Sequence, residues 1–592
     1  MSELLFQQLA DADIEALSQW IASSHRPDLS DAVWFDSLAS DSQSDVVMNS
    51  WKAGDYDRLD LSLPLAWDSL CADDRSWGSQ LHGWKFMDRP IQEFIRTGDK
   101  AYLQWCLDRA VSWSERYSDQ ETGNAIVWYN MALGQRALRL AGLIYLGAKN
   151  GIALAELRSL LSAVDRHRHE FSLESSFNPR TNHGYFVAIG QTVLGTTLEA
   201  VPEMSGLAEE GRERLAVMIR TQFLPDGGHS EHSPEYHRML MQSFQIAVDN
   251  GLIEDSDLTS RLRKAADLLG WMIQPNGSLV PLGDTPYVNM IDGSHPLTLS
   301  PETNFLMSGG SFGQACKAEL GVFQESGYAF VRSPQPQGET KPPTSSYLAF
   351  TAAFHGRAHK HADDLNFVWY DRGQEILVEG GRYGYGAQLP VDSPLRSDGF
   401  YYADPFRRFV ESTMAHNTVT ANGRNHDRRR APAGSGLGVC EQVGDVFILQ
   451  GRMEHGGWIH RRKIELKPGI GLTVTDDVQS TDAMKRDYQV WFNISGELDS
   501  NSSPSAGLSW SSPGGEWNLT LETEPGVLVN GPIRESDSPL RGWRSVEDGT
   551  REGVWSVCLE APKTRHYVFT SRFTFDSAYD SRRADNNPRK YV

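Results

Sequence analysis

The spacing of apolar residues is helical from about residue 90 to about residue 275. In this stretch apolar positions recur every three or four residues, which is typical of amphipathic helices. The breaks between the periodic runs, such as GAKNG, PDGG and PNGS, are short and contain residues that end helices or form turns. Short loops predict antiparallel helix pairs in a bundle, a solenoid or a toroid, and the absence of a strict repeat disfavours a regular solenoid. The predicted helices are 101–117, 126–146, 154–167, 185–198, 207–223, 234–250 and 258–272.

The pattern changes near residue 320, where short alternating or β-branched segments begin. Gly, Asn, Asp or Pro separates these segments, and this arrangement predicts an antiparallel β-sandwich of many strands. The segments are GYAFVRS, SSYLAFTAAF, LNFVWYD, EILVEGG, NTVTANG, DVFILQG, KIELK, GLTVTDDV, YQVWFNI and HYVFTS. We therefore predict a multidomain α+β chain. Its parts are an N-terminal helical and loop segment (1–80), a domain of helical hairpins (81–318) and a β-sandwich domain (319–592).

The net charge of the chain limits the classes of molecule that it is expected to bind. A formal net charge of −21 disfavours nucleic acid as the partner, although a basic cleft for an anionic substrate can exist in an acidic protein. Three short basic runs, beginning at Arg407, Arg428 and Arg461, are interpreted as solvated turns or strand ends. Five scattered cysteines without a CxxC pair argue against a disulfide framework and a cysteine zinc site. The sequence is also compatible with a homo-oligomer.

The location of the protein is predicted from two absences in the sequence. The N-terminus has no basic region, apolar core or small-residue cleavage site of a signal peptide. No segment reaches the roughly 18 uncharged apolar residues that a membrane span needs. We expect a soluble, cytoplasmic protein without a membrane partner, or a periplasmic or secreted one if a leader has been removed.

Three histidines in two segments of the C-terminal half are candidates for a site. His359 and His361 stand two apart in HGRAHKHADDLNFVWY, where the pattern becomes strand-like, and this spacing predicts side chains on one face of a sheet. His416 comes just before the β-branched run of HNTV. Three imidazoles on neighbouring strands can hold a divalent metal, polarise a bound anion or move protons. These segments therefore predict an active site.

Three segments of the helical half are further candidates. Asn182 and His183 directly precede a predicted helix, whose free amides and dipole favour an anion, although Asn182 could simply cap that helix. The segment DGGHSEHSPEYH places several polar residues around a second helix start, where Ser233 and Pro234 fit the cap and first position. Asp284, in the turn PLGDTP, is interpreted as structural. The candidates in the second segment are His229, Glu231, His232, Tyr236 and His237.

Together these residues suit β-elimination from a uronic acid. Elimination removes a weakly acidic proton next to a carboxylate and expels the neighbouring glycosidic oxygen. Asn and His donors, or a metal, can neutralise the carboxylate, while a base takes the proton and an acid protonates the leaving oxygen. A tyrosine can serve in both proton transfers if cationic neighbours lower its pKa from about 10. The residues of this set are Asn182, His183, Tyr236, His359, His361 and His416.

Five ordered motifs resemble those of the heparinase II/III-like polysaccharide lyases. They are NHG (182–184), DGGHSEHSPEYH (226–237), GRAHKHADDLNF (356–367), EGGRYGY (379–385) and STMAHNTV (412–419). The resemblance covers roughly residues 80 to 500 and implies an (α/α) toroid followed by an antiparallel β-sandwich.

The resemblance also implies roles for individual residues. Asn182, with His183, would neutralise the substrate carboxylate, and Tyr236 would be the catalytic acid. The base would be His183 or His359, depending on which uronate epimer is cleaved. Arg136 falls where the family often places an arginine lining the cleft, and Glu231 and His237 are further candidates for substrate binding.

The resemblance further implies a divalent metal, commonly zinc, in the sandwich. The matching positions are His361, Glu379 and His416, and two histidines with one carboxylate form a sound zinc shell. Glu379 stands where the family usually has an aspartate, so its longer side chain could alter or abolish the site. A purely hydrogen-bonded trio is the alternative.

The leading functional hypothesis is a lyase that acts on an anionic, uronate-containing polysaccharide or oligosaccharide. Glycosaminoglycans are the first substrate class and alginate-type polyuronates the second. A glycoside hydrolase is another hypothesis, and it would need two carboxylates such as Glu231, Asp226 or Asp363 at a defined separation. A non-catalytic glycan-binding protein of the same fold is the last hypothesis.

Overall fold

The computed structural model forms two compact units. The helical unit contains residues 1–222 and 243–260, and the sandwich unit contains 223–242 and 261–592. Each unit is described on its own. The predicted segment 1–80 and the predicted loop SPQPQGETKPPTSS lie partly outside the described residues. Those described are 5–26, 29, 48–52, 56–69, 75–118, 125–291, 297–334, 345–429, 434–500, 502–503, 507–513 and 517–576.

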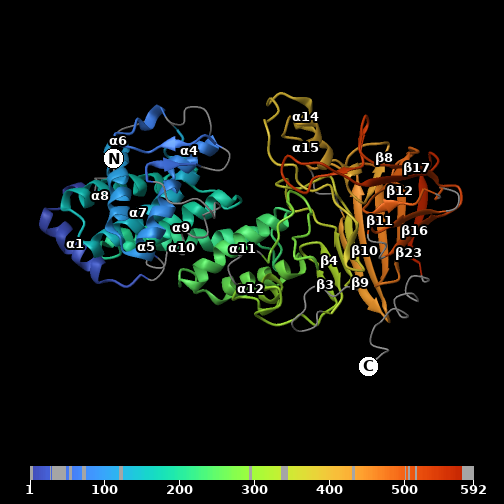
Figure 1. Cartoon of the computed structure of the whole chain (residues 1–592), viewed down its shortest axis with the longest axis horizontal. Helices are drawn as coiled ribbons and strands as arrows, with labels where there is room; N and C mark the ends of the chain where they lie inside the picture. The colour runs from blue at the N-terminus through green and yellow to red at the C-terminus, as the bar shows by residue number, and fades with distance from the viewer. Residues whose placement is uncertain are drawn as a thin grey trace. The chain divides into compact units, whose positions relative to one another are not determined.

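The helical unit is built mainly from helices, and short connections join those from α7 to α10 (Figure 1). The division between the units falls inside α11 (Pro234–Asp249) and α12 (Ser256–Trp271). The short strands β1 (Ser50–Trp51) and β2 (Leu59–Asp60) form a ladder in this unit. The remaining helices are α1 (Asp11–Ser23), α4 (Arg75–His82), α5 (Asp88–Thr97), α6 (Lys100–Tyr117), α7 (Asn130–Asn150), α8 (Leu154–Ser172), α9 (Asn182–Thr197) and α10 (Pro202–Gln222).

Glycines bring α7 and α9 into close contact at the centre of the helical unit. A side chain on Gly134 of α7 would collide with the backbone of Phe186, and one on Gly190 of α9 would collide with Gly134. Helix α7 is buried along nearly its whole length, which explains its apolar composition on every face. This packing fixes the start of α9, where Asn182 and His183 lie.

All seven predicted helices are present, and their ends differ from the predicted ends for physical reasons. The apolar pattern of the helix predicted at 126–146 stops at Leu146, but α7 continues to Asn150. Gly151 ends it in a left-handed conformation (φ 81°), as expected for a glycine after the last helical residue. Apolar periodicity indicates which face of a helix is buried, but it does not indicate the capping residues at which the helix begins and ends.

The sandwich unit contains two antiparallel sheets. The larger has the order β17-β22-β13-β7-β6-β5-β4-β3, with β8 paired to β13. Its strands are β3 (Leu320–Phe323), β4 (Tyr328–Arg332), β5 (Tyr347–Thr351), β6 (Phe367–Asp371), β7 (Gln374–Leu377), β8 (Val419–Ala421), β13 (Tyr488–Ile494), β17 (Leu528–Ile533) and β22 (Trp555–Glu560).

The second sheet has the order β14-β15-β16-β23-β12-β11-β10-β9. Two short ladders, β18 (Ser536–Asp537) with β19 (Leu540–Arg541) and β20 (Trp543–Arg544) with β21 (Glu552–Gly553), lie outside both sheets. The strands of the second sheet are β9 (Gly436–Val443), β10 (Val446–His455), β11 (Trp458–Lys467), β12 (Gly471–Ser480), β14 (Glu497–Leu498), β15 (Leu508–Ser511), β16 (Asn518–Thr523) and β23 (His566–Phe575).

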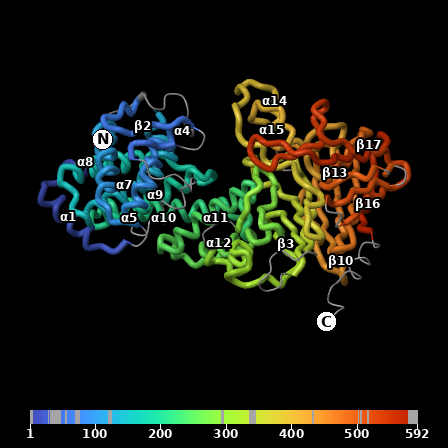
Figure 2. The backbone as a smooth tube through the Cα atoms, viewed as in Figure 1, coloured from blue at the N-terminus to red at the C-terminus, as the bar shows by residue number. Residues whose placement is uncertain are grey.

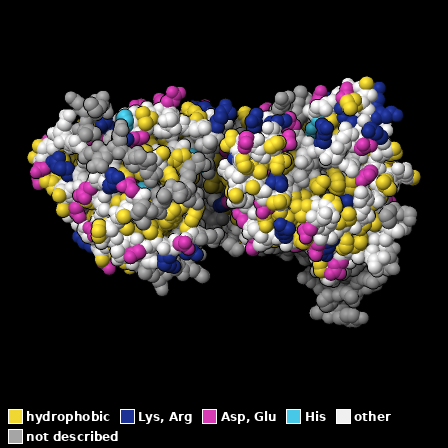
Figure 3. All heavy atoms as spheres, turned by 90° about the horizontal axis from the view of Figure 1, so that it is seen from above, with side chains coloured by type: hydrophobic (Ala, Val, Ile, Leu, Met, Phe, Trp, Pro, Cys, Tyr) yellow, Lys and Arg dark blue, Asp and Glu magenta, His cyan; other side chains and the backbone are white. Residues whose placement is uncertain are grey.

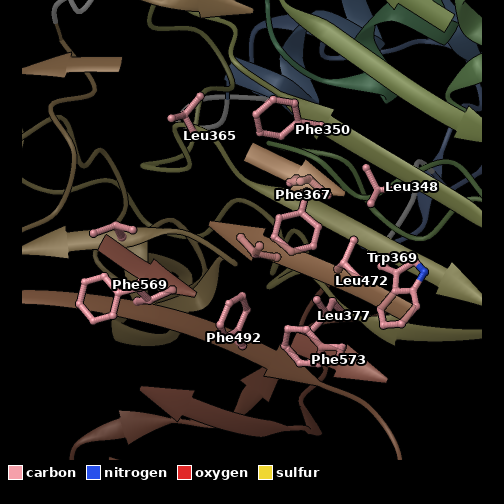
Figure 4. Close-up of a cluster of buried hydrophobic side chains, with 14 of the residues drawn as sticks. Leu348, Phe350, Leu365, Phe367, Trp369, Leu377, Leu472, Phe492, Phe569 and Phe573 are labelled. Atoms are coloured by element: carbon pink, nitrogen blue, oxygen red, sulfur yellow. The ribbon is translucent and has the colours of Figure 1, made fainter. Parts of the chain in front are cut away.

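The core of the sandwich unit lies between the inner faces of the two sheets (Figure 4). Trp369 of β6 contacts Phe573 of β23 with ring centroids 6.3 Å apart. Along β10, every second residue is buried, as expected for a strand with one face toward a core. The predicted order of a helical part followed by an antiparallel sandwich is confirmed.

Helices also pack on the sheet that contains β4 and β5. Leu268 and Met272 join a second buried cluster with Phe330 of β4 and Tyr347 of β5. This packing places the C-terminal part of α12 and α13 (Pro301–Met307) in the sandwich unit. The domain boundary at 318/319, drawn where the sequence pattern changes, stays a prediction.

Short helices follow β7 in the sandwich unit. Figures 1 and 2 show α14 (Pro394–Ser397) and α15 (Pro405–Val410) lying together in the gold segment of the chain. The surface seen in Figure 3 carries acidic and basic side chains interspersed with apolar ones. None of the helices in the described part of the chain has the length and apolar character needed to cross a membrane.

Candidate active site

The loop between β5 and β6 carries two of the predicted histidines. The prediction that His359 and His361 lie on a strand is wrong, because residues 352–366 form turns and bends rather than a ladder. His359 has a φ of 57°, a left-handed conformation that no strand residue adopts. The Asp284 amide donates to the His359 carbonyl (3.1 Å), which fixes the loop beside the turn PLGDTP. The two imidazoles nevertheless lie in the same site, because both contact the carboxylate of Asp284.

Asp284 lies at the centre of the constellation, and the interpretation that it is merely structural is corrected here. Its Oδ2 lies 2.9 Å from His359 Nδ1 and accepts from the Tyr385 hydroxyl (3.3 Å). Its Oδ1 lies 2.9 Å from His361 Nε2 and accepts a hydrogen bond from Arg407. These five residues, Asp284, His359, His361, Tyr385 and Arg407, are called the Asp284 cluster below.

Arg407 supplies the fixed positive charge of the cluster. It comes from α15 and is 1% exposed, so the interpretation of its basic run as solvated is wrong for this residue. The guanidinium also pairs with Glu411 one turn later (2.8 Å), and Glu411 pairs with Arg428 (2.9 Å). Burial alone would raise the pKa of Asp284, but Arg407 and the hydrogen bonds from both histidines hold it well below its ordinary value. Asp284 is therefore a buried, ionised carboxylate.

Tyr236 extends from the first turn of α11, which begins at Pro234 as predicted. Its hydroxyl lies 2.9 Å from the Tyr385 hydroxyl. Its ring stacks on His359 with centroids 3.6 Å apart. A tyrosine could serve in both proton transfers if cationic neighbours lowered its pKa, but burial raises the pKa of Tyr236 to about 12. The phenol is therefore protonated at neutral pH, which is the form required of an acid.

Glu231 lies on the other side of His359. Its Oε2 is 3.7 Å from His359 Nε2, whereas Nδ1 faces Asp284. Burial raises the pKa of Glu231, although His359 opposes that shift. When Nδ1 donates its proton to Asp284, Nε2 is the ring atom left to take or give a proton. The geometry thus assigns the two nitrogens of His359 different tasks.

Two of the residues predicted to bind substrate lie in the protein interior. Arg136 is fully buried in α7, where Nε donates to His167 (3.1 Å) and Nη1 to the carbonyl of His82 (2.6 Å). His237 is fully buried in α11, and its Nε2 lies 2.7 Å from the carbonyl of Ala265. These contacts give both residues a structural role. A direct contact with substrate stays a prediction for each.

Asn182 and His183 lie in the helical unit. Asn182 is the first residue of α9, so the cap position belongs to Thr181. His183 Nδ1 lies 2.9 Å from the hydroxyl of Tyr129. Both side chains are half-buried, and their predicted roles toward a substrate carboxylate stay predictions.

The three predicted metal ligands are all buried, but they are not equivalent. His361 Nδ1 and His416 Nε2 have no hydrogen-bond partner among the described residues, and the two rings have centroids 5.4 Å apart. Glu379 Oε2 lies 2.7 Å from His416 Nδ1, and Oε1 accepts from Asn366. The longer side chain that replaces the expected aspartate thus supports His416. Two buried imidazole nitrogens remain available to a metal.

Two other groups of residues have ligand atoms within 4.8 Å of one another. The first is Asp284, His361 and Glu411, and the Arg407 guanidinium contacts both of its carboxylates. The described part of the sandwich unit therefore contains groups that could hold a metal ion. In this first group a cation of the chain itself already balances the carboxylates.

The second group is Asp364, His426 and His455. Lys360 Nζ lies 3.1 Å from Asp364 Oδ1. The Asp364 amide donates to His426 Nδ1 (3.1 Å), so the lone pair that a metal would need is already engaged. Lys360 thus balances the charge of Asp364, and His426 has no nitrogen left for a metal, because Nε2 lies 2.7 Å from the carbonyl of Val419. We therefore favour the free nitrogens of His361 and His416.

Two of the three carboxylates proposed for a hydrolase are already engaged. Asp226 accepts from the amide (2.8 Å) and hydroxyl of Ser326, and Asp363 pairs with Lys360. Of the three, only Glu231 lies in the site next to His359. A glycosidase needs two carboxyl groups facing the scissile bond, so the arrangement disfavours hydrolysis.

Three residues of the site escaped the sequence reasoning: Asp284, Tyr385 and Arg407. Tyr385 lies at the end of the motif EGGRYGY, so that motif was a usable signal. Arg407 and Glu411 are spaced one helical turn apart, which predicts an ion pair but not its burial. No sequence signal distinguishes Asp284 from an ordinary turn aspartate.

Comparison with known proteins identifies relatives of both halves of the chain. A model described as heparinase II/III N-terminus matches residues 37–289. A second model, described as heparinase II/III-like, C-terminal, matches residues 317–574. An exo-oligoalginate lyase of Saccharophagus degradans is 24% identical over 379 residues, which are 56% of this chain and 50% of that protein. A heparin-sulfate lyase of Bacteroides thetaiotaomicron is 21% identical over 332 residues, which are 51% and 47% of the two chains. The chain spans about half the length of these curated relatives.

The fold matches that of a solved relative over nearly the whole chain. A mutant heparan sulfate lyase from Pedobacter heparinus superimposes with a TM-score of 0.73 and 15% sequence identity. The match covers 95% of this chain and 88% of the other. The predicted fold class, an (α/α) toroid followed by an antiparallel β-sandwich, is confirmed.

Proposed function

Because this chain belongs to the heparinase II/III-like family, we propose that it is a polysaccharide lyase that cleaves a uronate-containing glycan by β-elimination. The observation that carries the proposal is the pair formed by Tyr236 and His359. A protonated phenol stacks on an imidazole whose orientation is fixed by a buried, ionised aspartate. An acid and a base held side by side can serve the two proton transfers of an elimination.

The proposed reaction divides these transfers between named atoms. His359 Nε2, or His183 for the other uronate epimer, takes the proton next to the carboxylate. The electron pair of that C–H bond forms the new carbon–carbon double bond as the bond to the glycosidic oxygen breaks. The Tyr236 hydroxyl gives its proton to the leaving oxygen, which is the role that its raised pKa favours. Asn182 and His183 keep the predicted role of neutralising the carboxylate.

The proposed substrate is anionic. The curated relatives are named for oligoalginate and for heparin sulfate, and both names denote uronate-containing chains. Glycosaminoglycan-like chains are our first substrate class, and alginate-type polyuronates are the second.

The function is tested by ultraviolet absorbance while the purified protein meets heparan sulfate, chondroitin sulfates, hyaluronan, alginate and short oligomers of each. Elimination creates a conjugated double bond, so absorbance is expected to rise with at least one of these glycans. A flat trace with new reducing ends would identify a hydrolase. A flat trace without new ends on every glycan would contradict the proposed reaction.

We also propose that His361 Nδ1 and His416 Nε2 hold a divalent metal, with zinc the favoured ion. Two buried imidazole nitrogens without partners fit such an ion, and Asp284 and Glu379 fix the opposite nitrogens of the same rings. When bound, the ion would supply fixed positive charge beside the site. The residues of the chain perform the proton transfers described above.

The metal proposal predicts a loss of bound zinc that does not depend on activity. Elemental analysis should find about one zinc per chain in the wild type and almost none in the double variant His361→Ala, His416→Ala. Glu379→Gln should weaken zinc binding by about 10- to 100-fold, because it removes the carboxylate that orients His416. His426→Ala is the matched control and should keep its zinc. Zinc retained by the double variant, or lost from the control, would contradict this assignment.

A further inference from the structure

A small hairpin from the C-terminal part of the sandwich unit packs against the segment that carries Tyr385. Strands β20 and β21 pair with each other, and residues 545–551 form the loop between them. Arg544 anchors the hairpin, because it pairs with Glu375 of β7 (2.7 Å) and with Glu552 across the hairpin (2.9 Å). The loop therefore has a fixed base on the sheet.

Backbone contacts join this loop to the segment Gly380–Tyr385. The Ser545 amide donates to the Gly380 carbonyl (2.9 Å), and the Gly549 amide donates to the Tyr383 carbonyl (3.1 Å). Gly381 has a φ of 73°, and a side chain there would collide with the Ser545 carbonyl. Only glycine allows the two segments to approach this closely. The loop thus holds the backbone that ends in Tyr385.

Asp548, in the middle of this loop, fixes the guanidinium of Arg382. Arg382 Nε donates to Oδ1 (3.0 Å) and Nη2 to Oδ2 (2.6 Å), which is the two-pronged geometry of an arginine–carboxylate pair. The Arg382 guanidinium carbon lies 5.3 Å from the centre of the Tyr385 ring. Nη1 makes no hydrogen bond to any residue that the structure describes. The Arg382 side chain is 18% exposed and that of Asp548 is 46% exposed.

The exposed pair does more to orient Arg382 than to stabilise the fold. Ion pairs on a surface contribute little to stability, because water and salt screen them. The pair does, however, occupy the Nε–Nη2 edge of the guanidinium and leaves Nη1 unused, in a group whose central carbon lies 5.3 Å from the centre of the Tyr385 ring. Arg382 favours the ionised form of Tyr236 as well, which indicates that its charge reaches the site. A fixed cation with an unused donor edge is suited to a planar anion.

We propose that Asp548 is a positioning residue of the lyase site, which holds Arg382 so that its free edge binds an anionic group of the substrate. The group is a carboxylate or a sulfate on a sugar bound beside the tyrosine pair. This inference rests on the proposed function. It gives the hairpin that β20 and β21 form a part in substrate recognition. Arg382 makes the contact, and Asp548 acts through Arg382.

The test separates binding from turnover in three variants. Arg382→Gln should raise KM by about 10- to 100-fold and change kcat by less than about threefold, since it removes a charge-assisted contact to bound substrate. Asp548→Asn should raise KM by a smaller factor of about 3 to 10, because Arg382 keeps its charge but loses its orientation. Asp548→Glu should restore part of the loss, because it keeps a carboxylate in the loop. KM and kcat are measured with the glycan that the wild type cleaves best.

A matched control separates recognition from general stability. Glu454→Gln removes a carboxylate from another exposed pair, Arg452–Glu454 on β10, and should leave KM unchanged. Unchanged KM in Arg382→Gln and Asp548→Asn, with an active wild type, would overturn the inference and leave the proposed function intact. An effect on melting temperature alone would overturn it as well.

The remaining case is a wild type that cleaves none of the glycans, which would be a failure of the proposed function. Calorimetry with a short uronate oligosaccharide then decides the inference. Binding that is at least tenfold weaker in Arg382→Gln than in wild type would support it, and equal or absent binding would overturn it.

Discussion

Replacing Tyr236 with phenylalanine is expected to lower kcat by about 10²- to 10⁴-fold while folding and substrate binding remain nearly unchanged. The variant keeps the ring that stacks on His359 and removes only the hydroxyl that faces Tyr385. Tyr385 also contacts His359 by its ring, but at a centroid distance of 6.3 Å, whereas the ring of Tyr236 stacks directly on the imidazole at 3.6 Å. KM should therefore stay within a few-fold of the wild-type value.

The measurement is the rate of double-bond formation under saturating substrate, together with the melting temperature. Tyr370→Phe is a matched control in the same unit, because the Tyr370 hydroxyl bonds to the carbonyl of Gly373 (2.5 Å). It removes the same atom from a structural tyrosine and should leave kcat unchanged. Full activity in the Tyr236 variant would show that the leaving oxygen receives its proton from another group.

Periodicity could predict elements such as α6 and β10 because each of them buries one face. The helices from residue 100 onward show apolar spacing along their whole length, and β10 alternates buried and half-buried residues. The short strands near the C-terminus, such as β20 and β21, were not predicted, since two residues carry no period. Helix ends were misplaced where a cap or glycine, rather than the apolar pattern, sets them.

The site was harder to predict than the fold because loops build much of it. His359 and His361 were expected on a strand, but they meet through Asp284, which belongs to a turn distant in the sequence. A hydrogen-bonded centre of this kind produces no periodic pattern in the sequence. The sequence could therefore identify candidate residues by their chemical type but could not predict how they contact one another. The role of Glu379 could not be predicted for the same reason. Its sequence position suggested a metal ligand, but in the structure its carboxylate contacts His416 Nδ1 and so orients that ring.

The burial of Arg407 shows how far local sequence can mislead about charge. A run of two arginines usually lies in solvent, and Arg408 is indeed only half-buried. Arg407 instead balances the charges of two buried carboxylates, Asp284 and Glu411. A buried carboxylate without a compensating charge is unfavourable, so Arg407, which contacts both carboxylates, should contribute strongly to the stability of the cluster.

Replacing Arg407 with leucine should therefore destabilise the sandwich unit by about 3–5 kcal/mol at neutral pH and abolish activity. The leucine leaves Asp284 and Glu411 buried without their shared cation, and it removes the charge that holds Asp284 ionised beside His359. Arg408→Leu is the matched control, because Arg408 Nη1 donates to the carbonyl of Ala403 (2.6 Å) and not to a carboxylate. The control should lose no more than about 1 kcal/mol. Urea unfolding measured by circular dichroism gives both values.

The pH dependence of this loss tests its electrostatic origin. In the wild type the pKa of Asp284 lies below its unfolded value of about 4, so its stabilisation is present at neutral pH and is lost only as pH falls through the folded pKa. Without Arg407 the effect of burial is less compensated, so that pKa should rise, and the buried charge then destabilises the variant most at neutral pH. The difference between variant and wild type should therefore shrink as the pH falls from about 7 toward about 4. A difference that does not change with pH would mean that the lost packing of the guanidinium, and not its charge, stabilises the cluster.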